Sequence, residues 1–339
     1  MKIEGKSGTC AIAVGEKISR LRNYTGSGSL AIITDSTVRR IHGKLFPEAE
    51  VIEIGIGEGA KTLSTVNGIY MKFLEIEADR SFFVVGIGGG IVCDVAGFAA
   101  STYIRGLRCG FVPTTLIAQA DAAVGGKNGV NLEGYKNLIG TIRQPEFVLC
   151  DISLLSTLPL RELRCGFAEI IKAGCIADAK LFTFLEENSA ATLSLKQTAI
   201  EKAMHDALAV KVGIVSRDEN EKGERMKLNF GHTLGHAIEK ACLLPHGEAI
   251  SIGMACAARI SCEKGMLSSE EAARIEKLLG IFRLPTRLAD GKEKLMDAIK
   301  KDKKRFGGKV KMALLEGIGN AKLCDVSFSE LEGVFDDLH

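Results

Sequence analysis

Residues Phe82 to Asp94 read FFVVGIGGGIVCD, and this stretch decides the fold. Phe82 to Ile87 is short, apolar and rich in aromatic and β-branched residues, which predicts a buried β-strand. The glycines after it are typical of a strand-to-helix turn whose backbone N–H groups approach a phosphate or pyrophosphate at the helix N-terminus. The spacing is not a clean Gly-x-Gly-x-x-Gly, so a plain tight turn is the alternative interpretation.

The first half of the chain repeats this alternation of strand and helix. Further strand-like segments are Ala11 to Val14, Leu30 to Thr34, Val51 to Ile54, Gly110 to Val112 and Phe147 to Cys150, with helical patterns at Ser36 to Leu45 and Leu63 to Ile76. Alternation of this kind implies a mainly parallel sheet covered by helices, with ligands at the carboxyl ends of its strands. We therefore expect an α/β domain with a Rossmann-like sheet over residues 1–155.

The second half has a different pattern. Helical periodicity recurs in Glu162 to Ala177, Leu193 to Val215, Phe230 to Cys242, Glu248 to Lys264, Ser269 to Leu279 and Lys292 to Lys301, and only Val310 to Leu315 resembles a strand. This predicts a mostly α-helical domain over residues 156–339. Two domains of this kind favour an active site in the cleft between them.

Composition excludes several classes of protein. The chain has 339 residues, of which 46% are hydrophobic and 25% charged, and its net charge of +2 gives no electrostatic signature of nucleic-acid binding. We expect no membrane span, because no uncharged apolar run reaches about 18 residues. The ten cysteines form no Cys-x-x-Cys pair and lie mostly in apolar segments, which favours reduced thiols and a cytoplasmic location.

Three of the six histidines lie in one segment, Asn229 to Glu248, which reads NFGHTLGHAIEKACLLPHGE. His232 and His236 are four residues apart, so on a helix they share a face, and His246 follows an expected helix end at Pro245. Imidazole is a common metal ligand, and three ligands with an open position is the catalytic arrangement for zinc. Chance spacing and a simple helix junction are the alternative.

Glu169 and Lys172 lie at i and i+3 on a helix that is otherwise apolar. A carboxylate and an ammonium in such surroundings need either each other or a ligand. An internal ion pair is one interpretation. The other makes Glu169 the carboxylate that completes the metal site.

A second polar cluster lies in the first half. The segment Ala120 to Asn137 gathers amides, cations and glycines, and Arg105, Thr114 and Thr115 lie upstream. This composition favours an anion site.

Taken together, these residues resemble the 3-dehydroquinate synthase family of the sugar-phosphate cyclase superfamily, from about Glu58 to Gly319. The resemblance rests on the ordered motifs GGGIVCDVAGF, TYIRG, VPTTL, GGK, KNLIG, GFAEIIK, NFGHTLGHAIE and HGEA. Glu133 and Tyr135 stand where the commoner family pattern has proline and glycine, and Ala122 and Ala123 stand where it has serines.

The resemblance implies a lyase of the shikimate pathway of aromatic amino acid biosynthesis, a homodimer that uses NAD and Zn²⁺, with Co²⁺ as a substitute. Metal ligands would be Glu169, His232 and His246, whereas His236 would serve proton and phosphate chemistry. The NAD site would comprise Asp35, Glu58, Lys61, Gly89, Gly90, Asp94, Thr114, Thr115, Asp121, Lys127 and Lys136. The sugar-phosphate substrate would meet Lys127, Lys136, Asn137, Lys172, Lys211, Arg225, Asn229, Arg105 from a second subunit, and Lys303 or Lys304.

Other functions remain as alternatives. Cyclases that make 2-deoxy-scyllo-inosose or a valiolone share the implied fold and cofactors, but Asn229 and His236 match the dehydroquinate pattern. Glycerol-phosphate and metal-dependent alcohol dehydrogenases share the architecture and would accumulate NADH. A non-catalytic binding protein would lack metal and NAD.

Overall fold

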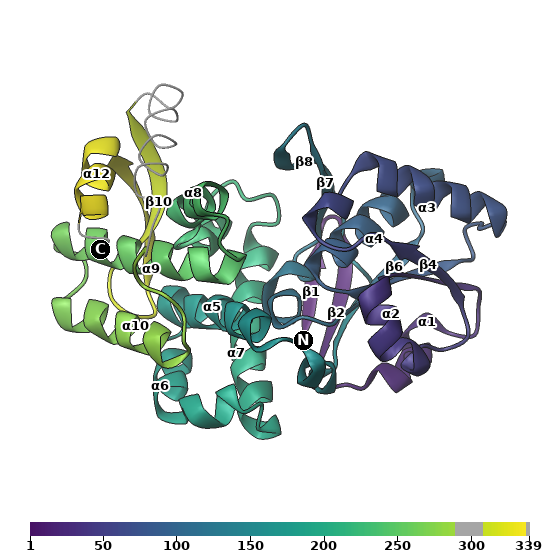
Figure 1. Cartoon of the computed structure of the whole chain (residues 1–339), viewed down its shortest axis with the longest axis horizontal. Coiled ribbons are helices and arrows are strands. Elements are labelled where there is room, and N and C mark those ends of the chain that lie inside the picture. Colours follow the sequence, from purple (N-terminus) through teal and green to yellow (C-terminus); the bar gives the residue numbers. More distant parts are fainter. Residues whose placement is uncertain (289–307, 337–339) are drawn as a thin grey trace. The chain divides into compact units, whose positions relative to one another are not determined.

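The computed structural model describes residues 1–288 and 308–336, and the chain divides between Pro159 and Leu160 into two compact units (Figure 1). The helix expected at Lys292 to Lys301, and both Lys303 and Lys304, lie outside the described residues.

The first unit is built on a seven-stranded sheet with the order β1-β2-β9-β6-β5-β3-β4. Its strands are β1 (Lys2–Gly5), β2 (Gly8–Val14), β3 (Leu30–Asp35), β4 (Glu50–Ile54), β5 (Phe83–Gly88), β6 (Arg108–Pro113) and β9 (Phe147–Cys150). Only β1 pairs antiparallel, with β2, so the mainly parallel sheet is confirmed. Its α-helices are α1 (Arg22–Thr25), α2 (Ser36–His42), α3 (Leu63–Glu75) and α4 (Gly90–Thr102).

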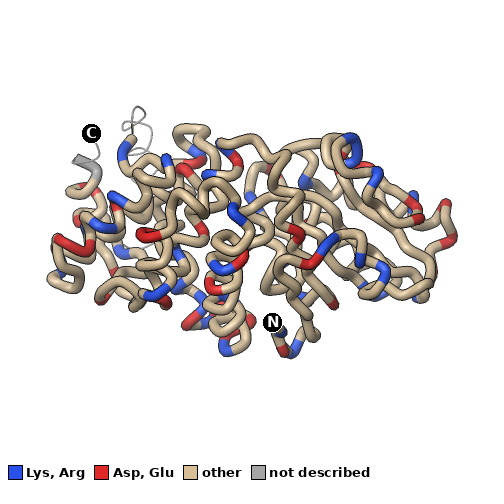
Figure 2. Tube along the Cα trace, turned by 90° about the horizontal axis from the view of Figure 1, so that it is seen from below, with Lys and Arg blue, Asp and Glu red and all other residues tan. Residues whose placement is uncertain are grey.

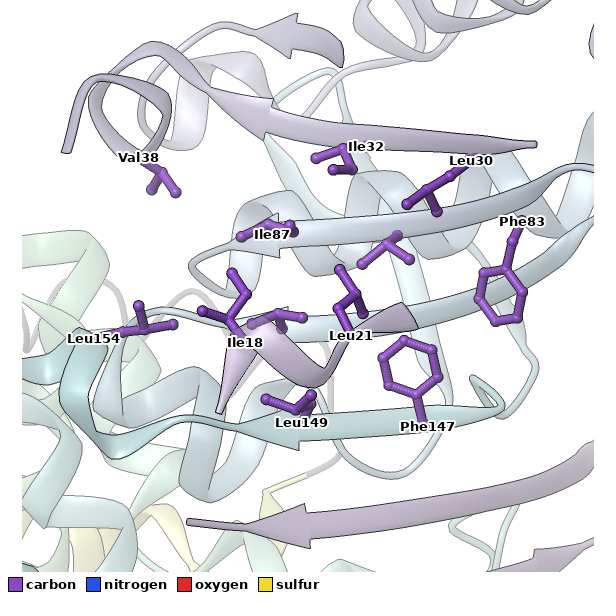
Figure 3. Close-up of a cluster of buried hydrophobic side chains, with 12 residues drawn as sticks. Ile18, Leu21, Leu30, Ile32, Val38, Phe83, Ile87, Phe147, Leu149 and Leu154 are labelled. Carbon is purple, nitrogen blue, oxygen red and sulfur yellow. The ribbon is translucent and has the colours of Figure 1, made fainter. Parts of the chain in front are cut away.

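The core of this unit explains why its strands read as continuous apolar runs. Alternate residues of β3, β5 and β9, such as Leu30, Val85 and Phe147, form one buried cluster (Figure 3). Their neighbours Ala31, Val84 and Val148 are also fully buried, on the other face. A sheet buried on both faces selects apolar residues at every position, which is the signature of parallel sheets.

The strand order places a ligand site. The chain passes from β3 outward to β4 and then returns to form β5 on the opposite side of β3. The direction of winding therefore reverses between β3 and β5, and ligands of open α/β sheets bind at such a point, beyond the carboxyl ends of the strands. Asp35 and Gly88 end these two strands.

A hairpin of β7 (Lys127–Leu132) and β8 (Tyr135–Ile142) follows β6, and sequence analysis missed it. A register shift between Val130 and Leu132 breaks the period-two pattern that would have revealed the strands. Its two-residue turn, Glu133 and Gly134, has φ values of 49° and 77°, as in a type I′ turn. A proline could not adopt the φ of Glu133, so this turn is incompatible with the proline of the commoner family pattern.

The second unit is mostly helical, as predicted. It contains α5 (Leu160–Ala177), α6 (Ala179–Leu193), α7 (Gln197–Arg217), α8 (His232–Cys242), α9 (His246–Glu263), α10 (Ser269–Ile281) and α12 (Phe328–Asp336), and an antiparallel pair, β10 (Lys309–Leu315) and β11 (Ala321–Ser327). The prediction of a single strand in this half was wrong. Lys322 and Asp325 interrupt the apolar pattern of β11, so its sequence does not resemble a strand. Helix α5 packs against α6, α7 and α9 and is buried along most of its length.

Charge is mixed over the surface. Figure 2 shows Lys and Arg interspersed with Asp and Glu along the traces of both units. Within residues 1–288 and 308–336, every helix is too short or too polar to span a bilayer.

The turn of the β7–β8 hairpin yields a stability prediction. A Cβ at Gly134 would meet no atom within 4 Å, so Gly134→Ala isolates the cost of a positive φ. We expect this variant to destabilise the hairpin by about 1 kcal/mol and to speed amide hydrogen exchange in β7 and β8 roughly fivefold. Glu133→Asn should slow the same exchange, because Asn tolerates this region better. Equal exchange rates in all three proteins would contradict the turn assignment.

Candidate active site

Three helices of the second unit bring Glu169, His232 and His246 together. Glu169 lies in the middle of α5, His232 is the first residue of α8, and His246 is the first residue of α9. One expectation needs correction: the preceding helix ends at Cys242, and Pro245 caps the start of α9 rather than ending a helix. His246 therefore returns to the site because a new helix starts there.

The three side chains converge on one point. His232 Nε2 and His246 Nε2 each lie 3.6 Å from Glu169 Oε1. All three ligand atoms lie within 4.8 Å of one another. Two imidazole nitrogens and one carboxylate oxygen form a catalytic zinc-type donor set.

Both imidazoles are oriented by hydrogen bonds at the opposite nitrogen. His232 Nδ1 lies 3.2 Å from the Phe230 carbonyl oxygen, and His246 Nδ1 lies 3.0 Å from Glu239 Oε2. Because both oxygens can only accept, each Nδ1 carries a proton, which leaves each Nε2 as the nitrogen that faces Glu169 and could bind a metal. Such outer-shell partners are what a metal-binding histidine needs.

Glu239 is a residue of this site that was not predicted from the sequence. The signal was available, because Glu239 follows His236 by three residues and His232 by seven and so shares their face of α8. A carboxylate at that position points to an orienting partner for a ligand.

The Glu169 carboxylate fits a metal. The residue is 3% exposed, and among the described residues neither of its oxygens has a hydrogen-bond partner, although Lys172 forms an ion pair with Oε2. A buried carboxylate without hydrogen bonds is costly unless a cation compensates it. The ion pair with Lys172 and the metal-ligand interpretation thus both apply, since Oε1 still faces the two histidines.

The pKa values follow from burial and charge. Burial, together with the nearby charge of Lys172, lowers the pKa of His232 to about 3. Burial also lowers the pKa of His246, but Glu169 and Glu239 outweigh it and raise that pKa to about 9. Burial raises the pKa of Glu169, yet Lys172 and the two histidines hold it well below its usual value.

His236 lies beside this cluster. Its ring centroid is 5.3 Å from that of His232 and 5.9 Å from that of His246. It forms a second possible donor set with Glu239 and His246, which is more exposed than the first. Spacing alone could not separate the two sets. The buried carboxylate of Glu169 favours the first.

Three more of the residues expected at the substrate, Lys211, Arg225 and Asn229, belong to the same unit. Lys211 is 8% exposed in α7, and Arg225 is 3% exposed in the 3-10 segment η7 (Glu224–Asn229). Arg225 donates to the Glu219 carbonyl at 2.5 Å, and Asn229 donates to Glu221 Oε1 at 2.7 Å. These buried cations can recognise anionic groups.

The first unit offers a site for a dinucleotide at the start of α4. A Cβ on Gly88 would lie 2.5 Å from Val92, so this glycine allows β5 to approach α4. Gly89 and Gly90 instead begin the helix, where backbone N–H groups favour an anion. Added Cβ atoms there would come within 3.2 Å of Thr115 and Ala122, respectively. The Gly-rich segment is therefore both a packing turn and a helix start suited to phosphate.

The expected cofactor residues surround this helix start. The Thr114 N–H donates to the Gly88 carbonyl at 2.8 Å, Thr115 Oγ1 accepts from the Ala118 N–H, and Asp121 lies in the π-turn Ala118–Ala122. Asp35 accepts from the Val38 N–H at 2.9 Å and so caps α2. Ala122 faces Gly90, so the departure from serine occurs beside the helix start.

A polar network continues from α4. Lys61 is 5% exposed, forms an ion pair with Asp94 and donates to Asn137 Oδ1 at 2.5 Å. Asn131 donates to Glu58 Oε1 at 2.7 Å and accepts from the Asn137 N–H at 2.8 Å. Cofactor residues expected from the sequence thus share one network with Asn137, a residue expected at the substrate.

Three further residues expected from the sequence at the cofactor or substrate also lie in the first unit. Lys127 begins β7, and Lys136 is the second residue of β8. Arg105 ends the 3-10 turn η4 (Tyr103–Arg105), is exposed, and has a φ of 68°.

Comparison with known proteins finds relatives over most of this chain. The family model for the 3-dehydroquinate synthase N-terminal domain matches residues 51–165, and that for the C-terminal domain matches residues 166–305. A 3-dehydroquinate synthase of Dehalococcoides mccartyi is 38% identical over 323 residues, which cover 92% of this chain and 90% of the relative.

Two solved structures are also similar. The 2-epi-5-epi-valiolone synthase ValA of Streptomyces hygroscopicus subsp. jinggangensis, with NAD⁺ and Zn²⁺ bound, has a TM-score of 0.88 at 28% identity and covers 99% of this chain and 98% of its own. A 2-deoxy-scyllo-inosose synthase complexed with carbaglucose-6-phosphate, NAD⁺ and Co²⁺ has a TM-score of 0.85 at 28% identity, with complete coverage of both chains.

The raised pKa of His246 yields a prediction about metal affinity. Below about pH 9 a metal must displace a proton from His246, whereas His232 is already neutral. The apparent affinity of metal-free protein for Zn²⁺ should therefore rise about tenfold per pH unit up to about pH 9. Competition titration with a chromophoric chelator measures this slope.

Glu239→Gln is the matched variant, because it removes one of the two carboxylates that raise the pKa of His246. The affinity of this variant should level off at a lower pH. An affinity that does not change with pH in the unmodified protein would contradict the assignment of His246.

Proposed function

The chain belongs to the 3-dehydroquinate synthase family, and we propose that it converts 3-deoxy-D-arabino-heptulosonate 7-phosphate to 3-dehydroquinate and phosphate. This is a lyase reaction of the shikimate pathway and of aromatic amino acid biosynthesis. The observation that carries the proposal is the convergence of Glu169, His232 and His246 in a chain that matches the family over most of its length.

We infer that Glu169, His232 and His246 hold a divalent metal, with Zn²⁺ as the resident ion and Co²⁺ as a substitute. Two imidazoles and one carboxylate suit zinc in a catalytic site with an open position. The bound Zn²⁺ of the valiolone synthase and the bound Co²⁺ of the inosose synthase support this inference.

NAD⁺ is the proposed organic cofactor, bound at the start of α4. The N–H groups of Gly89 and Gly90 suit the pyrophosphate, and Thr114, Thr115 and Asp121 lie around them. Glu58, Lys61 and Asp94 form the polar border of this site. When bound, NAD⁺ supplies a hydride acceptor that is regenerated in each turnover, and the metal supplies a Lewis acid for a substrate hydroxyl.

The cationic side chains would bind and orient the substrate. Its phosphate and carboxylate are anionic, which suits Lys172, Lys211 and Arg225 in the second unit and Lys127 and Lys136 in the first. Asn137 and Asn229 offer amides for its hydroxyl groups. His236 is the proposed proton carrier, because an imidazole titrates near operating pH.

We further propose a cytoplasmic homodimer. All ten cysteines are free thiols, as expected for a reducing compartment. Arg105 is exposed on a turn in which Ile104 and Arg105 have φ values of 40° and 68°. Two consecutive non-glycine residues in this region are strained, and such strain clusters at functional sites, which supports Arg105 as a residue offered to a partner's substrate.

The assay that tests the reaction measures phosphate release from the heptulosonate phosphate with catalytic NAD⁺ and Zn²⁺, while absorbance reports NADH. We expect phosphate and 3-dehydroquinate in equal amounts and no net NADH. Net NADH would identify a dehydrogenase. Phosphate release only from the substrates of the valiolone or inosose synthases would identify one of those cyclases instead.

His232→Gln tests the metal centre within that assay. The histidine is neutral because its pKa is about 3, so its replacement by a neutral amide leaves no charge unpaired. We expect phosphate release to fall at least about 100-fold and bound metal, measured by mass spectrometry, to fall with it. His205→Gln is the control, because His205 is exposed on α7. Full activity of His232→Gln would exclude His232 as a ligand.

A further inference from the structure

We propose that Asn131 is a positioning residue that couples the cofactor site to the substrate-binding hairpin. The inference rests on the proposed function and concerns a residue to which that function assigns no role.

Hydrogen bonds of the main chain hold Asn131 in place, independently of its side chain. Its N–H donates to the Lys61 carbonyl at 2.9 Å, and it pairs with Thr62 in an isolated parallel bridge. The hairpin is therefore attached to the segment that follows the 3-10 turn η3 (Glu58–Ala60). An amide on a fixed backbone loses little conformational freedom when it forms hydrogen bonds.

Both the nitrogen and the oxygen of the Asn131 side-chain amide form hydrogen bonds. Nδ2 donates to Glu58 Oε1 at 2.7 Å, and Oδ1 accepts from the Asn137 N–H at 2.8 Å. Glu58 belongs to the proposed NAD site, and Asn137 to the proposed substrate site. Within the described chain, one amide thus contacts a residue of each.

The bulge in the hairpin explains why this contact matters. Val130 pairs with Ile139 and Leu132 with Tyr135, so Asn131 alone faces the three residues Lys136, Asn137 and Leu138. A bulge redirects side chains and is common beside active sites. Asn137 has a φ of 54°, which asparagine tolerates better than most residues. The hydrogen bond from its N–H to Asn131 Oδ1 holds it in this conformation and so helps to set the direction of Lys136 and Asn137.

The network closes through Lys61. Asn137 Oδ1 accepts from Lys61 Nζ at 2.5 Å, and Lys61 also pairs with Asp94 of α4. Displacement of Asn131 would therefore disturb Glu58 directly and Lys61 through Asn137. Kinetic effects on NAD and on the sugar phosphate should then depend on which end of the amide is lost.

Two substitutions separate the two ends. Asn131→Asp keeps an oxygen for the Asn137 N–H and turns a carboxylate toward Glu58, so KM for NAD⁺ should rise about tenfold, while KM for the sugar phosphate changes less than about twofold. Asn131→Ala removes both hydrogen bonds, so both constants should rise about tenfold. Asn67→Ala on α3, which removes an exposed amide outside the network, is the control and should change neither.

The double variant Asn131→Asp with Glu58→Gln tests the contact itself. Gln at position 58 can donate to the new carboxylate, so the hydrogen bond returns with donor and acceptor exchanged. Its increase in KM for NAD⁺ should be smaller than the product of the two single increases. This rescue would not be seen if Asn131 only stabilised the fold. Because the double variant does not depend on Asn131→Ala, the test remains valid even if Asn131→Ala does not fold.

Values of KM within twofold of the unmodified enzyme for Asn131→Asp, or multiplicative effects in the double variant, would overturn the inference. Failure of the proposed function is a separate outcome, because the unmodified protein would then release no phosphate. In that case, direct titration of NAD⁺ into the unmodified protein and Asn131→Asp still decides whether Asn131 positions Glu58.

Discussion

The carboxylate of Glu169 is the constraint on which the second unit depends. A charged group 3% exposed in the middle of an apolar helix cannot be solvated by water, and it must be compensated by cations or metal. Lys172 compensates one oxygen, and the other faces the Nε2 atoms of His232 and His246. Helix α9 packs on α5 and helix α8 packs on α9, and each of the two begins at one of these histidines, so both imidazoles reach this one buried oxygen.

In the first unit, the main constraint is the burial of the parallel sheet. Its parallel sheet is buried on both faces and leaves the strand ends as the natural place for a ligand. The start of α4 has N–H groups suited to phosphate, and the β7–β8 hairpin brings the amides of Asn131 and Asn137 to Glu58 and Lys61. We therefore propose that the two units divide the chemistry, with dinucleotide binding in the first and metal binding in the second.

The sequence predicted much of this because the decisive signals were local. The runs at Leu30 and Phe82 revealed the strands, and the apolar helix around Glu169 revealed the buried carboxylate. The hairpin was missed because its bulge breaks the period of two, and Glu239 was missed because its role depends on a histidine in another helix. His236 could not be separated from the ligands by spacing, since the choice rests on a carboxylate some 60 residues away in the chain.

Anomalous X-ray diffraction at the zinc absorption edge, on crystals of active enzyme, tests the central claim most directly. We predict one peak about 2.0–2.2 Å from Glu169 Oε1, His232 Nε2 and His246 Nε2. A peak held instead by His236, Glu239 and His246, or active crystals without a peak at either set, would contradict the account.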